Sequence, residues 1–305
     1  MKINSEDIKT YKKDGRMPVN EVYKRLSKLK DSLWVKEVIC SQKISLKNQV
    51  KYLPILAFRT RQKGDSLWII SGIHGEEPAG VNAIAKNIRL MNKLAKKIPI
   101  VLLPLCNPSG YARNWRYPDL KKPIRIGIPE SVGDSEHYLL NKKGKARAKK
   151  PALKEAEELT SYIIKHSKKY KPLVVFDLHE DESARKLYIY SQGKLKNYDP
   201  IARKVVGILK KRGFRFYDRG KTSFGQKIIK GVVSNIEDGS IDELLSAEKI
   251  IVNGNLRKGP DAKSVVVIET TTLGIPLKKR LKAHSCILKS SKKVYSLAKD
   301  IFDES

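Results

Sequence analysis

Four ionisable residues follow apolar runs of the kind that form buried strands. His74 and Glu77 come after LWIISGI, His179 comes after LVVFDL, and Glu269 comes after VVVI. In open α/β sheets, ligands collect just beyond the carboxyl ends of the strands. We therefore expect these four side chains to converge in one crevice.

This set of residues suits metal chemistry. Two imidazoles and one carboxylate form a fitting ligand set for catalytic zinc and leave a position for water. A further carboxylate outside that set could take a proton from the activated water. Two structural alternatives stay open: His179 as a hydrogen-bonded residue at a strand end, and Glu269 as a salt-bridge partner, because a carboxylate ending a buried strand needs a partner. The four residues together favour the metal site.

A sheet with flanking helices has to position these residues. The runs Leu67–Ile73 and Ile98–Leu103 predict buried strands. A helix from about Ala79 to Leu94 between them would complete a right-handed βαβ unit. Leu173–Leu178 and Val265–Ile268 predict two more buried strands.

The remaining segments predict loops, helices and a simple domain organisation. Residues 107–150 are rich in Gly, Pro and charged residues, and a loop of this length is either functional or disordered. Pro151 opens a predicted helix, and residues 280–301 predict a closing amphipathic helix. We expect one α/β catalytic domain, residues 46–305, with an N-terminal extension, residues 1–45, packed on it.

Composition excludes several classes of protein. The chain has 305 residues, 40% of them hydrophobic, which is enough for a buried core and excludes a disordered chain. The formal charge is +31, and 47 of the 63 basic residues are lysines. Because specific phosphate recognition relies on arginine, this excess indicates a solvated surface and no specific nucleic-acid partner, although polyanions should bind nonspecifically at low salt.

Cysteine usage and the N-terminus indicate a reduced compartment. Cys40, Cys106 and Cys286 form neither a disulfide framework nor a CxxC pair. The first residues lack the apolar core of a signal peptide, and no stretch approaches the roughly 20 apolar residues of a membrane helix. We expect a soluble cytoplasmic protein without a membrane span, and the sequence leaves its oligomeric state open.

Four motifs give the chain a family resemblance over roughly residues 50–300. GIHGEEPAG (72–80), LCNPSGY (105–111), FDLHEDE (176–182) and VIETTT (267–272) resemble successive signatures of the M14-type zinc carboxypeptidases. That clan includes the succinylglutamate desuccinylase/aspartoacylase enzymes. The resemblance implies one Zn²⁺ per chain on His74, Glu77 and His179, with Glu269 as general base. It also implies a mixed, mainly parallel eight-stranded sheet flanked by helices.

The resemblance also implies an arginine that stabilises the oxyanion, after the NPSG segment. Arg113 and Arg116 are the candidates, and the WR context favours Arg116. A guanidinium aimed at developing charge in a dry site is a strong stabiliser.

At the substrate carboxylate the chain departs from the family. Where the family has DLNR, this sequence has Asp-Leu-Lys-Lys at 119–122. We expect another group to bind the carboxylate: Arg113 first, with Lys121, Lys122 and Arg125 as alternatives, and with contributions from Asn107, Asn114 or the SVGDSEH stretch (131–137).

Three neighbours of His179 receive secondary roles. Asp177 is expected to point to the opposite side of the strand and to anchor the fold. Glu180 and Glu182 are expected outside the ligand set or facing solvent, and they are the next candidates for the base after Glu269.

The sequence therefore predicts a zinc metallocarboxypeptidase that hydrolyses a C-terminal peptide or amide bond by metal-activated water. The first alternative is an N-acyl amino acid deacylase of the succinylglutamate desuccinylase/aspartoacylase type. The second is a metal-free polyanion-binding protein, which the intact set of four residues disfavours. The expected partner is a peptide or acyl-amino-acid substrate.

Overall fold

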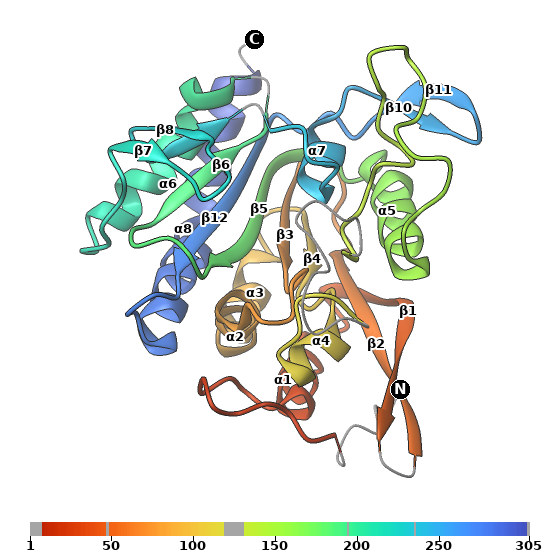
Figure 1. The fold of residues 1–305 in the computed structure, drawn as a ribbon, viewed down its shortest axis with the longest axis vertical. Helices are drawn as coiled ribbons and strands as arrows, with labels where there is room; N and C mark the ends of the chain where they lie inside the picture. Colours follow the sequence, from red (N-terminus) through yellow and green to blue (C-terminus); the bar gives the residue numbers. More distant parts are fainter. Residues whose placement is uncertain (1–7, 47–48, 119–130, 194, 235, 304–305) are drawn as a thin grey trace.

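A mixed sheet runs through the middle of the molecule in the computed structural model, which describes residues 8–46, 49–118, 131–193, 195–234 and 236–303 (Figure 1). Within these ranges the sheet has ten strands in the order β1-β2-β4-β3-β5-β12-β6-β9-β8-β7. Their bounds are β1 Trp34–Leu46, β2 Gln49–Thr60, β3 Ser66–Ser71, β4 Ile100–Leu103, β5 Pro172–Asp181, β6 Tyr188–Ser191, β7 Arg219–Lys221, β8 Lys227–Ile229, β9 Val232–Ser234 and β12 Ser264–Thr271. A separate hairpin pairs β10 Lys249–Val252 with β11 Asn255–Lys258.

The four central strands β4, β3, β5 and β12 are parallel to one another. On either side of this centre, β2 pairs antiparallel with β4, and β6 pairs antiparallel with β12. β3 is buried on both faces, as its apolar sequence requires. Because parallel strands end at the same edge, the residues that follow β3, β5 and β12 are brought close together.

Helices cover both faces of the sheet and bury alternate side chains of each strand. One apolar cluster takes Leu67 and Ile69 of β3, and the other takes Trp68 and Ile70. On the first face lie α1 Val19–Leu26, α2 Pro78–Lys86, α3 Ile88–Leu94, α6 Pro200–Lys210 and α8 Leu277–Asp303. On the second face lie α5 Lys154–Ser167 and α7 Ile241–Ser246. The short α4 Pro108–Arg113 follows β4, and a 3₁₀ turn spans Lys196–Tyr198.

The expected fold class is confirmed, with differences in detail. The sheet has ten strands within the described residues instead of eight, and the short strands β9, β8 and β7 form one end of it. Between named strands of the described residues, parallel pairing occurs among the four central strands and between β6 and β9. The single helix expected over 79–94 is divided at Asn87, whose φ of −108° is not helical. The proposed division between residues 45 and 46 stays a prediction, and it falls within β1, which pairs along its length with β2.

Among the described residues, no helix combines the length and the apolar character needed to cross a membrane.

Candidate functional site

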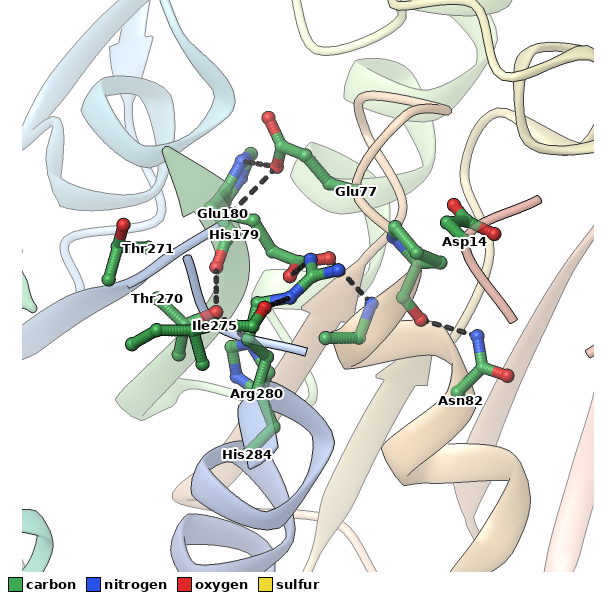
Figure 2. Close-up of polar contacts among 12 residues, drawn as sticks. Asp14, Glu77, Asn82, His179, Glu180, Thr270, Thr271, Ile275, Arg280 and His284 are labelled. Carbon is green, nitrogen blue, oxygen red and sulfur yellow. Dashed lines mark hydrogen bonds and ion pairs between the residues drawn. The ribbon is translucent and has the colours of Figure 1, made fainter. Parts of the chain in front are cut away.

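His74, Glu77 and His179 come together at the carboxyl edge of the central strands. His74 and Glu77 lie on the turn between β3 and α2, and His179 lies near the end of β5. The Nδ1 atom of His74 is 2.7 Å from Glu77 Oε1. The Nδ1 atom of His179 is 2.9 Å from Glu77 Oε2 (Figure 2). One ligand atom from each residue lies within 4.8 Å of the other two.

Close packing of two glycines fixes the turn that carries these ligands. A Cβ on Gly75 would lie 2.1 Å from the carbonyl carbon of Gly110, so the turn rests directly on the backbone of α4. A Cβ on Gly80 would lie 2.7 Å from Leu178 Cβ, so the start of α2 rests on β5. The GIHGEEPAG motif therefore joins ligand residues to glycines that let its backbone approach two neighbouring elements.

The electrostatics of the three residues fit a divalent cation. Burial opposes the charge on Glu77, but the imidazoles of His74 and His179 hold the pKa of its carboxyl well below the ordinary value. Burial and the nearby guanidinium of Arg116 lower the pKa of His74 to about 4, which leaves a neutral imidazole with a free lone pair. Neutral imidazole nitrogens and a carboxylate are the donors that zinc takes in catalytic sites. The set of two imidazoles and one carboxylate therefore fits the metal, which on binding would displace the proton that the raised pKa of His179 favours in the metal-free chain.

Asp177 contacts His179 on the ring nitrogen that does not face Glu77. Its Oδ2 lies 3.1 Å from His179 Nε2, and its side chain is fully buried. The expectation that Asp177 points to the opposite side of the strand was wrong, because residues two apart on a strand share a face. Burial acts to lower the pKa of His179, but the carboxylates of Asp177 and Glu77 outweigh it and raise this pKa well above the ordinary value. A carboxylate on the far nitrogen of a ligand histidine fixes the orientation of its ring.

Asp242 of α7 lies close to the same pair. One ligand atom each of Asp177, His179 and Asp242 falls within 4.8 Å of the others, and all three residues are buried. Burial, and then the charge of Asp177, raise the pKa of Asp242 well above its ordinary value, which favours the neutral carboxyl. No pattern in the sequence connects Asp242 with β5.

Glu269 lies on β12 beside the ligands. In the sheet register it pairs with His179 on one side and with Tyr188 of β6 on the other. Burial raises the pKa of its carboxyl to about 8, with the charge of Glu77 acting in the same direction and His179 opposing. Its role as the base stays a prediction.

Arg116 reaches the ligand cluster. Its Nη1 group donates to Glu76 Oε1 at 2.8 Å and to Glu77 Oε1 at 3.2 Å. Within the described part of the chain, its Nε and Nη2 groups have no hydrogen-bond partner. The backbone carbonyl of Arg116 accepts from Gly75 N–H, which ties this loop to the ligand turn.

The residues expected to bind substrate have other contacts. Arg113 donates to the carbonyl of Ser45 at 3.1 Å, and its guanidinium lies 4.5 Å from the centroid of the Trp115 ring. Asn114 ends α4 in the left-handed conformation, and its Oδ1 accepts from Arg16. Asn107 caps α4 through Gly110 N–H and donates to the carbonyl of Arg116. Their assignment to substrate stays a prediction.

The lysines and arginine of residues 121–125 lie outside the described residues. In the SVGDSEH stretch, Ser135 and Asp134 are buried. Ser135 bonds through its backbone to Gly239, and Asp134 accepts from the backbone of Ala152. This stretch therefore joins the segment before α5 to the loop before α7.

Glu180 and Glu182 differ in position from the proposed base. The Glu180 side chain is fully buried and pairs with Arg280 of α8, and burial raises its pKa to about 7 against the opposing charge of Arg280. Glu182 is exposed. Neither residue is placed like Glu269, which pairs with His179 in the sheet.

Arg16 is a site contact that sequence reasoning missed. Its side chain is fully buried, and its Nη1 group donates to the carbonyls of Gly75 and Tyr111 at 2.8 and 2.6 Å. Its Nη2 group also bonds Asn114. The segment before α1 is therefore fastened to the ligand turn and to α4. No periodic pattern marks this segment in the sequence.

A cavity of about 220 Å³ lies beside the end of β5 and includes Asp181 and Tyr188 in its lining. Tyr188, the partner of Glu269 in the register, forms part of its wall, and its hydroxyl donates to Asp181 Oδ2 at 2.7 Å. The lining residues are Asp181, Ser183, Ala184, Tyr188, Tyr217, Lys221, Thr222 and Ser223.

The sequence matches one protein family, and the fold matches solved structures. Residues 63–200 match the family described as succinylglutamate desuccinylase/aspartoacylase catalytic domain. This range contains His74, Glu77 and His179 and ends before Glu269. No curated protein matches the sequence.

Three solved structures illustrate the likeness in fold. A protein of Shewanella baltica OS155, provisionally assigned as a metallopeptidase, superposes with a TM-score of 0.67 and 18% identity over 91% of each chain. Carboxypeptidase A from Helicoverpa armigera gives 0.57 and 11% identity, over 96% of this chain and 75% of that one. A metallo-carboxypeptidase from Burkholderia cenocepacia gives 0.55 and 10%, over 96% and 70%. At these identities the likeness concerns the fold alone.

Proposed function

We propose that this chain is a zinc-dependent amide hydrolase of the superfamily shared by M14-type metallocarboxypeptidases and the succinylglutamate desuccinylase/aspartoacylase enzymes. Its leading activity is the cleavage of a C-terminal peptide or amide bond. The observation that carries the proposal is the convergence of two Nδ1 atoms on the two carboxylate oxygens of Glu77.

Glu269 and Arg116 each have a task in this reaction. When bound to His74, Glu77 and His179, zinc would supply Lewis-acid activation of water and of the scissile carbonyl. Glu269, outside the ligand set, takes a proton from water and delivers it to the leaving amine. Burial raises the pKa of this carboxyl, which favours its taking up the proton before passing it on.

Arg116 stabilises the negative charge that develops on the carbonyl oxygen. Its Nη1 group is held by Glu76 and Glu77, which fixes the guanidinium beside the ligands. The Nε and Nη2 donors, without a partner within the described residues, remain for the oxyanion. The cavity beside Tyr188 provides room for the part of the substrate that lies on the Glu269 side.

A second candidate is deacylation of an N-acyl amino acid. The observation that favours it is the match of residues 63–200 to the desuccinylase/aspartoacylase family. The same metal, base and arginine serve either reaction, because both break an amide bond. What differs is the group that the substrate presents beside the scissile carbonyl.

The first experiment tests zinc binding. We expect elemental analysis of the purified chain to find about one zinc per chain after zinc loading and buffer exchange. His74→Ala and His179→Ala should each lower zinc retention, whereas His137→Ala, outside the cluster, should not. A wild-type protein that retains no zinc after loading contradicts the proposal.

Paired substrates then separate the two reactions. The zinc-loaded protein is incubated with a set of peptides bearing a free C-terminus, with the same peptides amidated, and with N-acetyl and N-succinyl amino acids. Cleavage of free but not amidated peptides supports the carboxypeptidase. Release of acetate or succinate without peptide cleavage supports the deacylase. Equal cleavage of free and amidated peptides rejects recognition of a terminal carboxylate.

A further inference from the structure

The carboxylate of Glu77 is turned away from the helix that it precedes. Glu77 occupies the N-cap position of α2, where a side chain commonly accepts a backbone N–H of the first turn. Its carboxylate makes no such bond and instead faces His74 and His179. The first turn of α2 also contains no acidic residue. An acceptor for this helix start has to come from elsewhere.

Glu180 supplies that acceptor. Its Oε2 atom accepts the backbone N–H of Ala79, in the first turn of α2, at 2.7 Å. Its own backbone N–H donates to Glu77 Oε2 at 3.1 Å. One residue of β5 therefore contacts both the ligand carboxylate and the helix that carries it. A negative charge at a helix N-terminus is also stabilised by the helix dipole.

Arg280 holds Glu180 in this position from the far side. Its Nη1 group pairs with Glu180 Oε1, and its Nε donates to the carbonyl of Ile275 at 3.1 Å (Figure 2). The two side chains are 8% and 0% exposed. One turn further along α8, His284 Nε2 lies 3.2 Å from Thr270 Oγ1, next to Glu269 in β12. The first turns of α8 thus contact the residues that directly follow His179 and Glu269.

We propose that Arg280 is a positioning residue of the metal site, which rests on the zinc-binding function proposed above. Arg280 keeps the Glu180 carboxylate on the first turn of α2, and this leaves the Glu77 carboxylate free to face the metal. Removing a residue that holds a metal ligand in place by a hydrogen bond typically lowers metal affinity by about 10- to 100-fold. We expect a loss of that size in zinc affinity for Arg280→Met.

The test separates positioning from simple stabilisation. Zinc dissociation constants are measured by competition with a chromophoric chelator, and melting temperatures are measured on the metal-free proteins. Arg280→Met leaves the buried Glu180 carboxylate without its cation and should lower the melting temperature. The double variant Glu180→Leu/Arg280→Met removes the buried charge, so its metal-free melting temperature should recover while its zinc affinity stays low.

Two further variants complete the design. Arg280→Lys keeps a cation beside Glu180 but loses the bond to Ile275, so its zinc affinity should lie between those of wild type and Arg280→Met. Lys299→Met breaks an ion pair with Asp65 at the other end of α8, where Nζ and Oδ2 are 2.9 Å apart, and should bind zinc like wild type.

The outcomes distinguish this proposal from the function it rests on. Wild-type zinc affinity in the double variant overturns the positioning role and leaves the zinc site intact. Equal loss in Lys299→Met and Arg280→Met also overturns it, because the effect would then follow general destabilisation of α8. Failure of the wild-type protein to bind zinc overturns both proposals.

Discussion

His179 and Glu269 lie directly opposite each other in the parallel pairing of β5 with β12. Eight consecutive residue pairs, from Ser264 with Val174 to Thr271 with Asp181, fix this register. A slip of one residue would move Glu269 to the other face of the sheet. The distance between a proposed metal ligand and the proposed base is therefore set by the centre of the sheet and does not depend on a loop.

Replacing Glu269 by Gln should separate turnover from metal binding. The amide keeps the size of the side chain but cannot accept a proton, so we expect a rate loss of at least about 100-fold with zinc content unchanged. Elemental analysis and single-turnover kinetics measure the two properties. Loss of zinc in this variant would instead identify Glu269 as a ligand.

The same substitution should change how stability depends on pH. Burial raises the pKa of Glu269 from an ordinary 4.5 to about 8. Between these values the folded chain keeps a proton that the unfolded chain has lost, so this group lowers the free energy of unfolding as pH rises through the window. The free energy of unfolding of zinc-free Glu269→Gln, minus that of zinc-free wild type, should therefore increase from about pH 5 to about pH 8. Denaturant titrations at several pH values check this, and parallel curves for the two proteins contradict it.

Gly75→Ala should disturb the ligand turn. The added Cβ would lie 2.1 Å from Gly110 C and 2.4 Å from Trp115 O, and backbone atoms cannot move aside as a flexible side chain can. Overpacking of this kind costs about 1–3 kcal/mol. We expect a lower melting temperature and weaker zinc binding. Gly207→Ala in α6 is the matched control, because its Cβ meets nothing within 4 Å. It should be neutral or stabilising by about 0.5–1 kcal/mol.

Arg116→Ala should lower kcat far more than it changes KM. Removing one donor from an oxyanion site costs about 100- to 1,000-fold in kcat. Arg113→Ala is the comparison, and its guanidinium contacts Ser45 and Trp115, so we expect both constants to stay within about twofold. A rise in KM for Arg113→Ala that disappears with amidated peptides would support the sequence-based assignment of Arg113 to the substrate carboxylate.

The proximity of His74, Glu77, His179 and Glu269 was predictable from the sequence because it depends on strand ends alone. Apolar runs identified β3, β5 and β12, and parallel topology brings their ends together. The face of β5 on which Asp177 lies was also predictable, from the alternation of side chains along a strand, but our prediction was wrong. Its contact with His179 follows from the two-residue period of a strand.

Other contacts had no signal in the sequence. Arg280 meets Glu180 across 100 residues, and Arg16 meets Gly75 across 59, so neither pair has a spacing that local periodicity can reveal. The short strands β7 to β9 have three residues each, too few for an alternating pattern to stand out. The break at Asn87 was also hidden, because residues 79–94 keep a helical apolar pattern across it.

The position of β12 has a consequence for synthesis of the chain on the ribosome. β12 is the last strand along the described residues, yet it lies between β5 and β6 in the sheet. Until residues 264–271 have left the ribosome, β5 and β6 each have an open edge in the middle of the molecule, and open edges promote misassociation. The nascent chain therefore carries the proposed metal ligands long before it carries the proposed base. The proposed hydrolysis therefore requires that residues 264–271 have already been made.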